Sequence, residues 1–91
     1  MTGPLAEALG HVRNAVWQLM GSDEPNALAL GLECLDLEAL LNPDDREPEV
    51  VPLELDAAVS LAAAARLLDQ MRDHVTPAAW ASIQSLMTKL G

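Results

Sequence analysis

The sequence predicts an all-α fold, a small four-helix bundle in which two helical hairpins are joined by an acidic, proline-containing linker. Leu and Ala, both strong helix formers, supply most of the 51% of residues that are apolar. Phe and Tyr are absent and β-branched residues are few, which disfavours a sheet. Apolar side chains also recur at helical spacing in four segments, at about 4–20, 25–41, 54–74 and 77–90. A chain of 91 residues is long enough for one domain, 1–91, with a thin margin of stability.

The first predicted helix, at about 4–20, carries one apolar stripe. Pro4 suits its first turn, where the missing N–H would have no partner in any case. The stripe consists of Leu5, Ala8, Leu9, Val12, Ala15, Val16, Leu19 and Met20. Gly21 is expected to end the helix with a positive φ angle. Because the connection Ser22-Asp23-Glu24-Pro25 is short, the first two helices should pack as an antiparallel hairpin.

The second predicted helix, at about 25–41, carries two apolar faces instead of one. At 3.6 residues per turn, one face holds Leu28, Leu32, Leu35 and Ala39 and the opposite face holds Leu30, Cys34, Leu37 and Leu41. A helix of this kind needs cover on both sides, from its own chain, from a second copy or from another protein. Gly31, in the middle of the helix, is expected where a neighbouring helix approaches closely.

The linker, residues 42–52, combines three prolines with the carboxylates Asp44, Asp45, Glu47 and Glu49. Such a segment cannot continue a helix and resists burial. We therefore expect an exposed, fairly extended crossing between the two hairpins.

The third and fourth predicted helices form the second hairpin. The third, at about 54–74, is expected to be the longest, and its Ala62–Ala65 run should allow close packing of another helix. Thr76 and Pro77 are typical of a helix start, with Thr76 as the cap. The fourth helix, at about 77–90, has an apolar stripe made of Trp80, Ile83, Met87 and Leu90.

Charge is distributed unevenly along the chain. The formal net charge is −9, and −8 of it falls between Glu33 and Asp56, where nine carboxylates face one cation, Arg46. This field would repel nucleic acid and anionic membranes, whereas a basic protein surface would be attracted. No apolar run approaches the roughly 20 residues of a membrane span. With a single cysteine, and hence no internal disulfide, the chain is expected to be cytoplasmic.

No pattern of residues indicates catalysis, a metal site or a cofactor, so we do not expect an enzyme. The chain has two histidines, His11 and His74, and neither has the Glu-x-x-His spacing of a bundle metal site. Both are expected to be exposed. Cys34 lies among leucines, where a thiol is typically buried and unreactive.

The segment Leu30-Gly31-Leu32-Glu33-Cys34-Leu35 resembles the Leu-Gly-x-Asp-Ser-Leu attachment motif of acyl carrier proteins. Those proteins are also small, acidic and four-helical, and the resemblance implies a phosphopantetheine group attached at position 34. The sequence departs from the family at this position, because Cys34 stands where carrier proteins have the attachment serine. It also departs downstream, where an Ala-rich helix follows in place of shorter helices.

The function that the sequence favours is a non-enzymatic protein–protein interaction or regulatory module, a homodimer that presents an acidic surface. The predicted interaction surface comprises Leu30, Cys34, Leu37, Leu41, Asp44, Asp45, Glu47 and Glu49. Two alternatives remain open. One is a bundle that binds a small apolar ligand in a cavity lined by Met20, Met71, Met87 and the tryptophans; the other is a degenerate acyl-carrier-like protein.

Overall fold

The structure is a computed structural model that describes residues 4–42 and 56–90, and all its regular elements are helical. The four α-helices are α1 (Pro4–Met20), α2 (Ala27–Leu41), α3 (Ala57–Gln70) and α4 (Pro77–Leu90), with a 3₁₀ turn at Arg72–His74 before α4. The all-α prediction is confirmed, since no strand occurs within these two ranges. None of the helices described is both long and apolar enough to cross a membrane. The predicted linker lies almost wholly outside the described residues.

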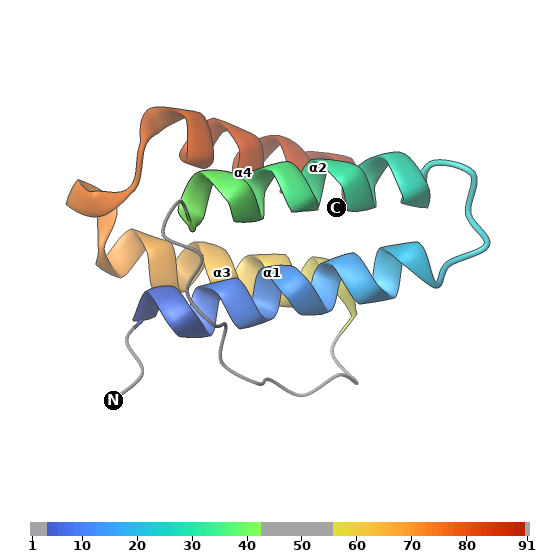
Figure 1. The fold of residues 1–91 in the computed structure, drawn as a ribbon, viewed down its shortest axis with the longest axis horizontal. Coiled ribbons are helices and arrows are strands. Elements are labelled where there is room, and N and C mark those ends of the chain that lie inside the picture. Colours follow the sequence, from blue (N-terminus) through green and yellow to red (C-terminus); the bar gives the residue numbers. More distant parts are fainter. Residues whose placement is uncertain (1–3, 43–55, 91) are drawn as a thin grey trace.

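The four helices form a bundle in which each helix packs against two neighbours. α1 contacts α2 and α3, and α4 contacts the same two helices, so α1/α4 and α2/α3 are the diagonal pairs. Figure 1 shows α1 and α2 side by side in the nearer layer, with α3 behind α1 and α4 behind α2. α2 therefore occupies a corner of the bundle, and only two of its sides are covered.

The core lies between the two layers and consists mainly of aliphatic side chains. Its largest fully buried members are Leu9, Val12, Leu37, Leu61, Leu68, Ile83 and Leu86. The α1/α3 contact is the most extensive in the bundle, and Ala64, within the predicted alanine run, is fully buried there. One polar pair crosses this contact: Asn14 Nδ2 donates a hydrogen bond to Ser60 Oγ over 2.5 Å.

The ends of α1 and α4 lie where the sequence predicts them. Thr76 Oγ1 accepts a hydrogen bond from the Ala79 N–H over 3.2 Å, as expected of a capping residue. Gly21 follows the last residue of α1, but its φ angle is not positive, contrary to our expectation. The chain instead leaves the helix through a bond from the Gly21 N–H to the Trp17 carbonyl.

The other two helices are shorter than predicted. α2 begins at Ala27, two residues later than predicted, and in the preceding turn Ser22 Oγ accepts a hydrogen bond from the Glu24 N–H. α3 begins after Asp56, whose backbone is extended and whose carboxylate caps the helix. It ends at Gln70, so that α1, with 17 residues, is longer than α3, with 14.

Gly31 marks a close approach of α1 to α2, as predicted. It is buried, and a Cβ atom at this position would lie 3.1 Å from Met20 Sδ and 3.6 Å from Leu19 Cβ. The distance to Met20 Sδ is tighter than ordinary van der Waals contact, whereas the distance to Leu19 Cβ is ordinary. A side chain at this position would require the Met20 side chain to shift by a few tenths of an ångström, so the missing Cβ atom suits the close packing of the first hairpin.

Candidate functional site

One of the two apolar faces of α2 lies inside the bundle. Cys34 and Leu37 are fully buried, Leu41 is nearly so, and Leu30 is partly buried against the core. These are the four apolar residues of the predicted interaction surface, and the fold uses them for its own packing. The four acidic residues of that surface, Asp44, Asp45, Glu47 and Glu49, lie outside the described residues.

The opposite face of α2 is exposed. Leu28, Leu32 and Leu35 keep 58%, 52% and 40% of their surface accessible, and Ala39 is also exposed. The helices that pack extensively against α2 in the described chain are α1 and α4, and these three leucines remain open to solvent. Exposed leucines are ordinary when scattered, but here they follow one another along a single helical stripe.

α1 extends this stripe with two further apolar side chains, Trp17 and Met20, which are 68% and 45% exposed. Two contacts fix how the helices align: Arg13 pairs with Glu38, and Met20 lies against Gly31. Trp17 lies one turn beyond Arg13, and Leu35 lies one turn before Glu38. Because the helices are antiparallel, these two residues lie at the same level.

We call this surface the α1/α2 apolar face; it comprises Trp17, Met20, Leu28, Leu32, Leu35 and Ala39. It contains five of the seven large apolar side chains that the described part of the chain exposes. The spacing of apolar residues in α2 predicts its part of this face, but the contribution of α1 does not follow from that pattern. Met20 was assigned to the core stripe, and that assignment is wrong. Helical spacing places Trp17 outside that stripe, and this spacing indicates that Trp17 points away from the core.

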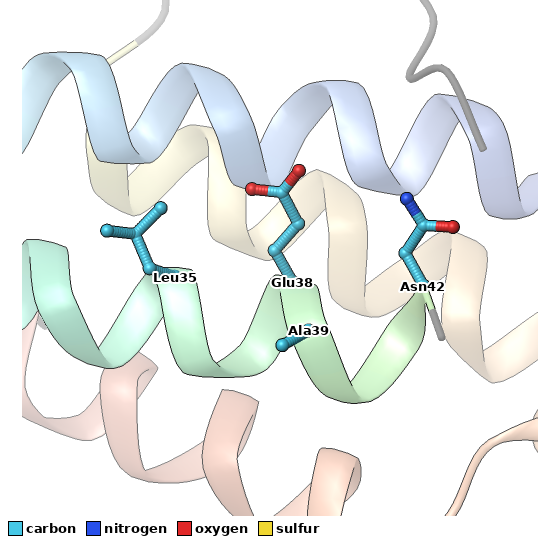
Figure 2. Close-up of a pocket in the computed structure, with 4 residues that line it drawn as sticks. All are labelled: Leu35, Glu38, Ala39 and Asn42. Carbon is cyan, nitrogen blue, oxygen red and sulfur yellow. The ribbon is translucent and has the colours of Figure 1, made fainter. Parts of the chain in front are cut away.

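Charged groups border the apolar face at both ends. At one end the Arg13 guanidinium lies 2.6 Å from the Glu38 carboxylate, and these side chains are 50% and 13% exposed. At the other end is the connection between the helices, where Asp23 and Glu24 are exposed. A small hollow lies near the Arg13 end, lined by Leu35, Glu38, Ala39 and Asn42. Figure 2 shows Leu35, Glu38 and Asn42 pointing from α2 toward α1.

The groups that could carry chemistry are either buried or dispersed. Burial, with a smaller contribution from the negative charge of Glu33, raises the pKa of the Cys34 thiol from 9.0 to about 11. This thiol is therefore protonated near neutral pH, and it has no exposed surface from which a phosphopantetheine group could extend. Residues 4–42 and 56–90 contain no group of three His, Cys, Asp or Glu side chains that could hold a metal ion.

His11 is buried, with 9% of its surface accessible, so the prediction that it is exposed was wrong. It lies one turn before Asn14 on the side of α1 that is closed by packing. The corresponding prediction for His74 falls on a side chain outside those described. The methionines also do not share one cavity: Met20 lies on the outer surface, whereas Met71 and Met87 pack against the core.

Comparison with known proteins adds no relative: no protein-family model, no curated protein and no solved structure matches the chain.

Proposed function

We propose that this protein is a non-enzymatic interaction module that forms a homodimer through its α1/α2 apolar face. One observation carries the proposal: exposed large apolar side chains are concentrated on this face and nearly absent elsewhere on the described chain. A contiguous patch of this kind is typical of a protein interface. Trp and Met, both present on the face, are among the residues enriched in interfaces.

The side of the bundle that carries the apolar face is large enough for a stable dimer interface. The two longer dimensions of the bundle are 35 and 25 Å, and α1 and α2 form one of its broad layers. That whole side is about as large as the roughly 800 Å² that each partner buries in a standard interface, and the apolar face forms part of it. Most homodimers have two-fold symmetry, in which each copy contributes the same patch.

The dimer would keep most of the negative charge on its outside. The net charge of −9 per chain doubles on dimerisation, and among the described residues the acids that border the apolar face are Asp23, Glu24, Asp36 and the paired Glu38. The acidic surface left outside would attract a basic protein partner, and that binding should weaken with added salt. In this proposal the apolar face holds the dimer together, and the acidic surface recruits the partner.

The test compares two leucines of α2 that differ in position but not in exposure. Leu35 is 40% exposed on the apolar face, and Leu40 is 43% exposed about 140° away around the helix. Each also has one acid a turn away, Glu38 and Asp36 respectively. We expect Leu35→Glu to convert the dimer to a monomer in sedimentation equilibrium, and Leu40→Glu to leave it a dimer.

Circular dichroism would confirm that both variants remain helical. A wild-type chain that is monomeric at high micromolar concentration would contradict the proposal. Equal weakening of the dimer by the two substitutions would show that a different surface is used.

A further inference from the structure

Resting on the proposed homodimer, we infer that its two copies pack with their helices antiparallel across the interface. In this arrangement Trp17 lies next to the two-fold axis, and Arg13 of each copy contacts the Asp23–Glu24 turn of the other. The partner of the apolar face is thus a second copy of the same chain, in one specific orientation.

Trp17 lies near the middle of the apolar face along the helix direction. The Arg13–Glu38 and Met20–Gly31 contacts show that each step forward along α1 corresponds to one step back along α2. Trp17 is therefore level with Leu35, between Leu28 toward the turn and Ala39 toward the other end. In an interface with two-fold symmetry, a residue at the centre meets its own counterpart. The large and 68% exposed Trp17 would be covered there.

The charges on either side of Trp17 are opposite in sign. Arg13 lies four residues from Trp17, about 6 Å along the helix, in one direction. Asp23 and Glu24 lie beyond the end of α1 in the other direction, roughly 9 Å away if the same rise is assumed. The two-fold axis of the antiparallel dimer passes next to Trp17, lies in the plane of the interface and is perpendicular to the helices. Rotation about this axis brings Arg13 of one copy close to the Asp23–Glu24 turn of the second copy.

The parallel alternative is electrostatically unfavourable. With the two-fold axis along the helices, the two turns would lie against each other, and four carboxylates would meet with no cation of the described residues between them. Arg13 is suited to the antiparallel contact because its side chain remains 50% exposed while it pairs with Glu38. A guanidinium has five N–H donors, so one carboxylate does not saturate it.

The experiment uses two variants with exchanged charges and follows their pairing at low salt by native mass spectrometry. One chain carries Arg13→Glu; the other carries Asp23→Lys and Glu24→Lys. In the antiparallel dimer each variant places like charges together, so each alone should dimerise at least about tenfold more weakly than the wild type. Mixed, they should form a heterodimer, because opposite charges then meet at both ends.

Lys89→Glu is the matched control. Lys89 pairs with Glu33 over 2.7 Å in another exposed interhelical ion pair, between α4 and α2 and away from the apolar face. This variant should dimerise as the wild type does. Its normal dimerisation would show that losing an intrachain ion pair is not what weakens the Arg13→Glu dimer.

A further mixture separates the two orientations. In an antiparallel heterodimer of the wild type with the Asp23→Lys, Glu24→Lys chain, one Arg13 faces the acidic turn and is attracted, and the other faces the two lysines and is repelled. This mixture should therefore show no preference for the heterodimer. Preferential heterodimers in this mixture would indicate turn-against-turn packing and overturn the inference. An unchanged dissociation constant for Arg13→Glu would do the same, and either result would leave the proposed dimer intact. A monomeric wild type would overturn both.

Discussion

At the residue scale, Cys34 has a different role in the structure from the one that its sequence context suggests. Its sequence context resembles a prosthetic-group attachment motif, yet its side chain is fully buried between α2 and the rest of the core. The attachment serine of a carrier protein must be reachable by a modifying enzyme. Cys34 is instead a small apolar residue of the core, which is the more common role of a free cysteine.

This role predicts a pH dependence of stability. The thiol ionises near pH 9.0 in the unfolded chain and near pH 11 in the fold, because burial raises its pKa. Between these values the unfolded state releases a proton that the folded state keeps, so stability decreases as pH rises, by at most about 1.4 kcal/mol per unit. Below pH 9 the effect is absent. Urea unfolding from about pH 8 to about pH 10.5 should therefore show a steeper loss for the wild type than for Cys34→Ala. Parallel curves would contradict the assignment.

At the scale of elements, the start of α3 depends on one side chain. The Asp56 carboxylate accepts a hydrogen bond from the Val59 N–H over 2.8 Å, and its charge is favourable at the helix N-terminus. We expect Asp56→Ala to lower the unfolding free energy by about 1 kcal/mol, measured by urea denaturation. Asp56→Asn, which retains a capping oxygen, should lose less. Equal losses for the two variants would assign the effect to charge alone.

The elements that the sequence predicts well are those whose ends carry their own signals. α1 and α4 begin with prolines at positions that suit them, and both have the predicted bounds. α3 ends earlier than predicted because Met71 leaves the helical conformation, and neither a glycine nor a proline signals this point. The core face of α2 could not be chosen from its own residues. Its two stripes are equally apolar, and the choice depends on the positions of α1 and α4.

At the scale of the whole molecule, the bundle has two unlike broad sides. The α1/α2 layer exposes Trp17, Met20 and three leucines on one face, whereas on α3 and α4 the large apolar side chain that stands exposed is Val59. Arg72 stacks over the Trp80 ring at 5.5 Å from its centroid, so the second tryptophan is partly covered within the monomer. Because of this asymmetry, the environment of Trp17 should change on dimerisation, whereas that of Trp80 should not.

Tryptophan fluorescence can therefore locate the interface. In a Trp80→Phe chain only Trp17 emits, and its emission should shift to shorter wavelength and resist acrylamide quenching as concentration rises, because dimerisation covers its 68% exposed side chain. A Trp17→Phe chain, in which only Trp80 emits, should show no such change with concentration. Both chains would be followed by light scattering at the same concentrations. If Trp17 remained open to acrylamide in a sample that is dimeric by mass, the α1/α2 apolar face would not be the surface that joins the two copies.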